Sequence, residues 1–281
     1  MLDIPNVDFT KSEEFPFISG DGYKVLCQYI LDRYYYPDRE MFSTGVNSNY
    51  IFVKTDYLQE FCNKNLPVLN KKKYYFNLIT GNSDYPINGS DIHIKILNNK
   101  YLLQWYAQNA QFNHSKLKIL PMGIENSVHL KKHNGIKGFL KEVYKRKLYL
   151  NINRKTLIRA NYSLDNNKSE RSKCQKLTGI QIDDKVSQYQ FFINMLFTNF
   201  VISPEGSGMD CHRIWEALYC GCVPIIISHK WTQPFINNFP IIGIENWNSF
   251  RKENFTKDLY NCIMRDWDIS KLEMSNFVKW W

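Results

Sequence analysis

The segment 203–227 carries side chains suited to holding a phosphorylated ligand. A glycine loop comes first and polar side chains follow it at helical spacing: Glu205, Gly206, Ser207, Gly208, Asp210, His212, Arg213 and Glu216. Glycines let a backbone approach a ligand and adopt a positive φ, and the start of the next helix attracts phosphate. Arg213 and Glu216 stand three residues apart and share a helix face. We expect Arg213 to contact diphosphate oxygens and Glu216 to accept hydrogen bonds from ribose hydroxyls.

One βαβ unit is expected to position these groups. The pattern predicts a strand at 200–203, a helix at 210–220 and a strand at 223–227. Asp210 is placed to cap the helix and Gly221 to end it. Ligands of open α/β sheets bind at the carboxyl ends of the strands, which favours binding roles for the whole set. On an arbitrary helix, Arg213 and Glu216 would instead be a surface ion pair, and His212 would be structural.

The rest of the chain predicts an α/β protein. Strands are expected at 51–55, 74–79, 101–105 and 117–120 and, after a basic helix at 138–146, at 147–152. The polar stretch 161–176 is expected to be a loop or frayed helix before a helix at 186–198. These elements predict two Rossmann-like domains, 1–145 and 146–281. The last helix, at 255–267, and the Trp-rich tail are expected to pack back on the first domain.

Composition limits the possible partners. The net charge of +9 suits an anionic ligand, but most of the lysines are scattered, which is typical of a solvated surface. No window reaches the ~18 apolar residues that a membrane span requires. Seven irregularly spaced cysteines fit reduced thiols, and Cys220-Gly221-Cys222 lacks zinc-site spacing. We therefore expect a soluble cytoplasmic protein without a metal.

The segment 200–228, FVISPEGSGMDCHRIWEALYCGCVPIIIS, resembles the nucleotide-sugar signature of exostosin-like glycosyltransferases. It is similar in particular to small soluble exostosin-like enzymes of large DNA viruses, and 80–86, 105–109 and 120–126 extend the likeness. The resemblance covers roughly residues 74–247. It implies a GT-B fold, with two Rossmann-like domains facing across a cleft, the donor on the C-terminal one and the acceptor mainly on the N-terminal one. For a virus protein the cytoplasm would be that of the infected host cell.

The resemblance also implies an inverting, metal-independent transfer from a UDP-sugar to a hydroxyl of an oligosaccharide or glycoprotein glycan. UDP-xylose is the first choice of donor, ahead of UDP-glucuronate, UDP-GlcNAc and UDP-galactose. No cofactor is expected beyond this co-substrate. A carboxylate must then take the proton of the acceptor hydroxyl, and positive groups must stabilise the leaving diphosphate.

Asp84, in the loop after the strand at 74–79, is our candidate base. It could equally be a turn residue, and Asp91 and Glu125 are the reserves. Glu125 is also a candidate contact for an acceptor hydroxyl. Arg154 and Arg159, placed just beyond the expected strand at 147–152, either face the donor phosphates or face solvent.

Two other functions stay open. A nucleic-acid-binding module would explain the positive charge, but it needs a clustered basic face or a fold signature that the sequence does not display. A catalytically inactive sugar-binding relative would bind the donor without turnover. We favour the enzyme, with no nucleic acid as partner and no membrane span.

Overall fold

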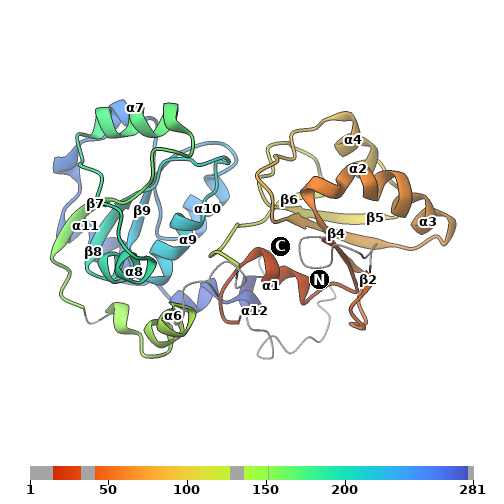
Figure 1. Cartoon of the computed structure of the whole chain (residues 1–281), viewed down its shortest axis with the longest axis horizontal. Helices are drawn as coiled ribbons and strands as arrows, with labels where there is room; N and C mark the ends of the chain where they lie inside the picture. The colour runs from red at the N-terminus through yellow and green to blue at the C-terminus, as the bar shows by residue number, and fades with distance from the viewer. Residues whose placement is uncertain (1–14, 33–41, 127–135, 151, 278–281) are drawn as a thin grey trace. The chain divides into compact units, whose positions relative to one another are not determined.

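The chain forms two compact units in the computed structural model, which describes residues 15–32, 42–126, 136–150 and 152–277 (Figure 1). Unit 1 comprises Met1–Met122 with Glu273–Trp281, and unit 2 comprises Gly123–Leu272. Our sequence boundary lay after residue 145. Helix α6 (Ile136–Lys145) instead groups with unit 2, because it contacts helix α9 (His212–Tyr219) of that unit.

Unit 1 is built on a six-stranded sheet in the order β2-β1-β3-β4-β5-β6. Its strands are β1 (Tyr29–Leu31), β2 (Phe42–Ser43), β3 (Tyr50–Lys54), β4 (Phe76–Gly81), β5 (Leu102–Ala107) and β6 (Leu117–Ile119). Strand β2 is antiparallel to β1, and the other neighbouring pairs are parallel. The strands predicted for this half of the chain are confirmed, with small shifts at their ends.

Helices cover both faces of the unit 1 sheet. They are α1 (Gly20–Lys24), η2 (Thr55–Tyr57), α2 (Leu58–Glu60), the π-helical turn η3 (Phe61–Asn65), α3 (Leu66–Lys71), α4 (Asp91–Leu97) and α12 (Met274–Phe277). Because strand side chains alternate, Ile51 and Val53 pack with residues of α2, α3 and α4, whereas Phe52 faces the other way. Lys24 of α1 lies over the Phe52 ring, so α1 covers the second face, as Figure 1 shows.

Unit 2 has a four-stranded parallel sheet in the order β10-β9-β8-β7. Its strands are β7 (Thr156–Ala160), β8 (Thr198–Ile202), β9 (Val223–Ile227) and β10 (Ile242–Ile244). Ala160 pairs with Ile202 of β8 and, on its other side, forms a parallel bridge with Ile182. The chain thus passes from β7 to one side and then returns to the other, so the strand order reverses at β7.

Helices also cover both faces of the unit 2 sheet. Besides α6 and α9 they are η4 (Leu148–Leu150), α7 (Lys168–Thr178), α8 (Gln188–Leu196), α10 (Gln233–Asn238), η5 (Trp247–Ser249), η6 (Lys252–Asn254), α11 (Lys257–Met264) and η7 (Ile269–Leu272). Phe200 and Ile202 of β8 pack with Cys174 of α7 and Tyr260 of α11. Helices α8 and α9 contact β8 and β9, and Figure 1 shows α9 and α11 on opposite sides of the sheet.

Two sequence predictions for unit 2 are corrected, and a third is confirmed in part. The strand expected at 147–152 is wrong, since Leu148–Leu150 forms a single 3-10 turn and the strand is Thr156–Ala160. Of the loop or frayed helix expected at 161–176, the helix is found as α7 over Lys168–Thr178, which buries only Arg171 and Cys174 and so lacks an apolar stripe. The last predicted helix, α11, belongs to unit 2, and the chain rejoins unit 1 at Glu273, which bridges to Phe17. The Trp-rich tail at 278–281 lies outside the described residues.

The cysteines form no disulfide. Cys27, Cys62, Cys174, Cys220 and Cys222 are buried, Cys211 is half-buried and Cys262 is exposed on α11. Burial raises the pKa of Cys174 and of Cys222 to about 12. Within the described parts of the chain, no helix is both long enough and apolar enough to cross a bilayer.

Candidate functional site

The carboxyl ends of β7 and β8 define the candidate site in unit 2. The register that pairs Ala160 with Ile202 brings the next residues, Asn161 and Ser203, side by side. From here the chain runs from β7 to α7 on one face and from β8 to α9 on the other. A crevice opens where connections leave a sheet in opposite directions, and α/β proteins bind ligands there.

Two buried polar atoms lie at this crevice without a partner. The Asn161 amide nitrogen Nδ2 and the Ser203 hydroxyl form no hydrogen bond to any described residue. The Asn161 carbonyl oxygen Oδ1 accepts from Nε of Arg213 at 3.1 Å, which fixes the orientation of the amide. A buried polar group without a partner costs roughly 1–3 kcal/mol, so a polar ligand that bonded to both atoms would recover that energy.

The loop between β8 and α9 is anchored by α7. Nε of Arg171 donates to the Glu205 carbonyl at 3.0 Å, and Nδ2 of Asn167 donates to the Gly206 carbonyl at 3.0 Å. The Glu205 carboxylate oxygen Oε1 lies 2.5 Å from Nε2 of His229, which follows β9. The loop is therefore held at both of its sides by described side chains, and Ser207 is exposed at its tip.

The two glycines of this loop do not have the conformation that we expected. Neither Gly206 nor Gly208 lies in the left-handed region. A Cβ at Gly206 would stand 3.2 Å from Nη2 of Arg171, so close packing on this arginine is the constraint at that position.

Two arginines place positive charge beside the crevice. The guanidinium carbons of Arg213 and Arg171 lie 5.7 and 5.9 Å from the centroid of the Tyr162 ring. Neither arginine forms an ion pair with a described carboxylate. Burial and the charge of Arg213 lower the pKa of Arg171. Two neighbouring cations without a carboxylate partner create a field that attracts an anion.

The N-cap of helix α9 lies one residue later than the sequence predicts. The N-cap is Cys211, whose side chain makes no capping bond, and not Asp210. Asp210 is buried, and its Oδ1 accepts from Nε1 of Trp215 at 2.7 Å. The predicted helix end is confirmed, because Gly221 has φ 66° and the N–H of Cys222 reaches back to the Ala217 carbonyl.

His212, Glu125 and Glu216 form a second polar group within unit 2. Nδ1 of His212 lies 2.8 Å from the Gly123 carbonyl and therefore donates to it, while Nε2 lies 3.6 Å from Oε2 of Glu125. Burial raises the pKa of Glu216, Glu125 raises it further, and the charges of His212 and Arg213 oppose the shift. Glu125, which we expected to contact the acceptor sugar, thus lies in one group with His212 and Glu216, which we expected to bind the nucleotide-sugar donor.

Arg154 and Arg159 do not lie where the sequence placed them, since the strand that they were to follow is not at 147–152. Arg154 precedes β7 and is buried, with its guanidinium bonded to five backbone carbonyls. Arg159 lies inside β7 and pairs with Asp183 at 2.5 Å. Arg154 thus has its protein partners away from the crevice, whereas Arg159 is held by Asp183, which lines a cavity together with Asn161.

Asp84 lies in unit 1, exposed in the loop that follows β4. Asn109 holds this loop by donating from Nδ2 to the Ser83 carbonyl at 3.2 Å. The reserve Asp91 is the first residue of α4. Sequence reasoning overlooked a neighbouring cluster in which Lys24 pairs with Asp21 at 2.8 Å and with the buried Asp32 at 2.7 Å.

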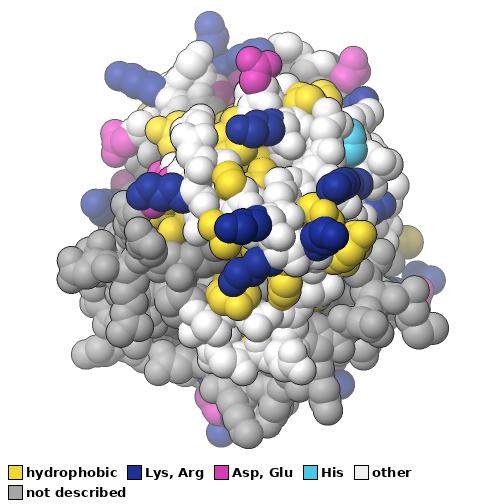
Figure 2. Space-filling view, turned by 90° about the vertical axis from the view of Figure 1, so that its right-hand side faces the viewer, with side chains coloured by type: hydrophobic (Ala, Val, Ile, Leu, Met, Phe, Trp, Pro, Cys, Tyr) yellow, Lys and Arg dark blue, Asp and Glu magenta, His cyan; other side chains and the backbone are white. Residues whose placement is uncertain are grey.

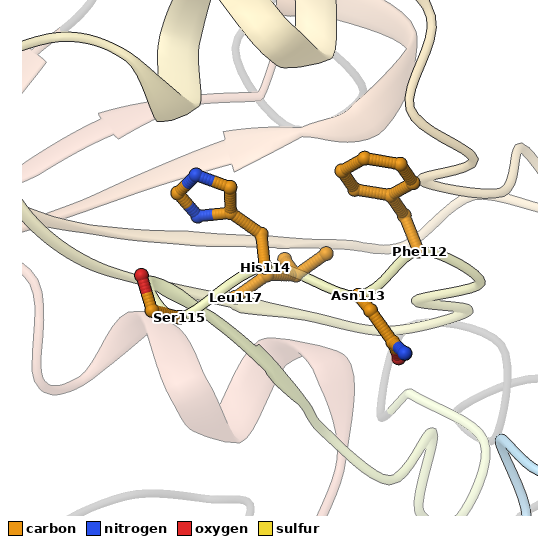
Figure 3. A pocket seen from close by; sticks show the side chains of 5 residues that line it. All are labelled: Phe112, Asn113, His114, Ser115 and Leu117. Carbon is orange, nitrogen blue, oxygen red and sulfur yellow. The ribbon is translucent and has the colours of Figure 1, made fainter.

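Each unit has a cavity of about 400 Å³ among its described residues. The first adjoins the crevice in unit 2 and is lined by Asn161, Tyr162, Ser163, Asp165, Asp183, Asp184, Lys185, Val186, Phe191 and Asn194. The second is a shallow hollow before β6 of unit 1. Figure 3 shows the Phe112 and His114 rings on one side of its loop and Asn113 pointing to the other. Only the first cavity adjoins the carboxyl ends of its sheet.

Asn161, Tyr162, Arg171 and Ser203 are the crevice residues that sequence reasoning missed. Ser203 was read as the end of a strand, and the other three fell in the supposed loop at 161–176. The alternation of Arg159 and Asn161 with Ile158, Ala160 and Tyr162 could have indicated the true strand and the residue that follows it.

Comparison with known proteins gives one partial likeness. A stretch of 64 residues, 23% of the chain, is 36% identical to a protein of Arabidopsis thaliana named "Probable glycosyltransferase At5g03795". The aligned stretch makes up 11% of the length of that protein. No family model matches the chain.

Proposed function

We propose that the chain is an exostosin-like glycosyltransferase that transfers a sugar from a UDP-sugar, with UDP-xylose as first choice, to a hydroxyl of a glycan. The observation that carries the proposal is the crevice at the β7–β8 switch point, where Arg171 and Arg213 lie beside the partnerless polar atoms of Asn161 and Ser203. The relative named as a probable glycosyltransferase supports the same activity class.

The donor is proposed to lie along this crevice. Its diphosphate would accept hydrogen bonds from the Asn161 amide, the Ser203 hydroxyl and the free N–H groups of α9, beside the charge of Arg213. The cavity lined by Tyr162 and Phe191 offers apolar and polar walls for the nucleoside. Glu216 is retained as the acceptor for ribose hydroxyls. Arg154 is no longer proposed as a phosphate ligand, since its N–H groups are bonded to carbonyls.

The transfer is proposed to invert the anomeric carbon without a metal. The Asp84 carboxylate takes the proton of the acceptor hydroxyl while the hydroxyl oxygen bonds to the anomeric carbon. The bond from that carbon to the diphosphate oxygen breaks at the same time. The charge that develops on the leaving UDP is stabilised by Arg213 and the start of α9. This scheme requires the GT-B arrangement, with unit 1 supplying the base and unit 2 the donor.

Calorimetric titration with UDP and a panel of UDP-sugars, in EDTA and again with manganese, tests the donor site. We expect binding in EDTA, and at least tenfold weaker binding for Arg213→Ala and for Asn161→Ala. Arg251→Ala is the matched control, because Arg251 is an exposed arginine of the same unit. Normal binding by both crevice variants would refute the site.

Turnover is measured separately as UDP released in the presence of glycan acceptors. Donor binding without release of UDP would identify a catalytically inactive relative. Failure to bind any nucleotide would refute the proposal as a whole.

A further inference from the structure

The amino edge of the unit 1 sheet gathers exposed lysines and exposed apolar side chains. Lys71, Lys72 and Lys73 precede β4, and Lys100 precedes β5, all exposed. Val68, Tyr75 and Leu103 are 51%, 56% and 44% exposed. We call these seven residues the lysine face. Figure 2 looks onto this side and shows Lys and Arg side chains mixed with hydrophobic ones.

Contacts between neighbouring segments make the lysine face one surface. Nδ2 of Asn99 donates to Oδ1 of Asn70 at 2.9 Å, which joins the turn before β5 to α3. The rings of Tyr75 and Tyr101 meet edge to face with centroids 5.3 Å apart. The lysines are therefore held on a common edge, at the opposite end of the sheet from Asp84.

We infer that the lysine face binds an anionic lipid surface. Lysines near an anionic leaflet are attracted to it, and apolar or amphipathic side chains between them can enter the headgroup region. Val68 is one helical turn from Lys71 and Lys72, so the two kinds of side chain alternate over the surface. Peripheral binding of this kind needs no membrane-crossing helix.

Lipid fits this surface better than nucleic acid. A single-stranded nucleic acid stacks its bases on free aromatic faces. Here Tyr101 is buried, and Nζ of Lys100 lies 4.9 Å from its ring centroid. Tyr75, which meets Tyr101 edge to face, is the one aromatic side chain among the seven residues of the lysine face, which is too few for successive bases to stack on. Val68 and Leu103 offer a base nothing to bond, whereas both would be buried in a lipid interface.

The attachment is independent of the proposed transfer reaction. The crevice residues belong to unit 2, and Asp84 lies at the carboxyl edge of unit 1. Variants of the lysine face should therefore leave UDP binding unchanged, which separates a failure of this inference from a failure of the proposed function.

Vesicle co-sedimentation of the full chain tests the inference. Vesicles are made of phosphatidylcholine alone or with about one-third phosphatidylserine, and the chain should sediment only with the anionic ones. Combined Lys71→Glu, Lys72→Glu and Lys73→Glu should lower the affinity on the order of 100-fold, at roughly fivefold per lysine. Combined Lys173→Glu, Lys252→Glu and Lys257→Glu makes the same charge change on exposed positions of unit 2 and should have a much smaller effect.

A second variant tests the apolar contribution. Combined Val68→Ser and Leu103→Ser keeps all charges and should still weaken binding severalfold. Equal sedimentation with neutral and anionic vesicles, equal losses in the two triple variants, or tighter binding to a single-stranded oligonucleotide than to the vesicles would each overturn the inference.

Discussion

Arg154 should contribute more to the stability of unit 2 than any ligand-facing arginine. It is 5% exposed, and its guanidinium donates to the carbonyls of Met195, Leu196, Thr198, Tyr149 and Cys220 at 3.4, 2.7, 2.7, 3.1 and 2.9 Å. Met195 and Leu196 end α8, and Cys220 caps α9. A cation at two negative dipole ends is stabilising, and here it also ties both helices to the start of β8.

Arg154→Ala removes the charge and leaves these carbonyls buried without a donor. A buried polar group left without its partner costs roughly 1–3 kcal/mol, so the loss of several such bonds should cost about 3–5 kcal/mol in total. In a unit of this size each kcal/mol lowers Tm by about 2–4 °C, so the transition of unit 2 should fall on the order of 10 °C. Arg154→Lys keeps the charge but offers three donors without the planar fork, and it should recover part of the loss.

Differential scanning calorimetry is the suitable assay, with Arg251→Ala as control. Arg251 also donates to two carbonyls, of Asn248 and Phe250, but it is exposed, so its loss should leave the transition near that of the wild type. A transition for Arg154→Ala within about 2 °C of the wild type would refute the reasoning that burial makes these bonds strong.

Three further outcomes are expected. Gly221→Ala should destabilise the protein by more than ~1 kcal/mol in urea denaturation, because φ is 66° and the new Cβ would stand 2.7 Å from Nη2 of Arg154. The Glu216 carboxyl has a pKa that folding raises above its ordinary value of 4.5. Its protonated form therefore stabilises the fold at pH values below 4.5, and this stability is lost as the pH rises through the pKa of the folded state. Glu216→Gln should therefore raise Tm at neutral pH, give no gain at about pH 4, and weaken UDP-sugar binding; a lower Tm at neutral pH would contradict this. Asp84→Asn should keep donor affinity and lower kcat at least 100-fold, and near-normal turnover would show that another group is the base.

Much of the fold followed from periodicity. The central strands β3 and β4 of unit 1 are mostly apolar and buried along nearly their whole length, so their pattern is strong. Strand β7 was misplaced because most of Thr156–Ala160 is only half-buried, while the more apolar Leu148–Leu150 forms a turn. Tyr149 of that turn packs against Gly221, and its carbonyl accepts a hydrogen bond from Arg154, a tertiary role without a local sequence signal.

The candidate site was predicted in its central segment and missed at its edges. The glycine loop and α9 were found because glycines and an apolar helix stripe are local features. Asn161 and Ser203 meet only through the pairing of β7 with β8, and Arg171 reaches Glu205 across 34 positions of sequence. Such neighbours depend on strand order, which one sequence does not display. Asp210 was misread for a similar reason, since its partner is the Trp215 indole and not the helix end.

The burial of the thiols decides how this protein can be labelled. Maleimides and similar reagents react with thiolates, and Cys174 and Cys222, with pKa values near 12, hold almost none at neutral pH. Cys262 is exposed on α11, so a limiting amount of reagent should attach a dye or spin label there first. Unit 2 thus carries its own attachment point for distance measurements, and one added surface cysteine in unit 1 would complete a pair.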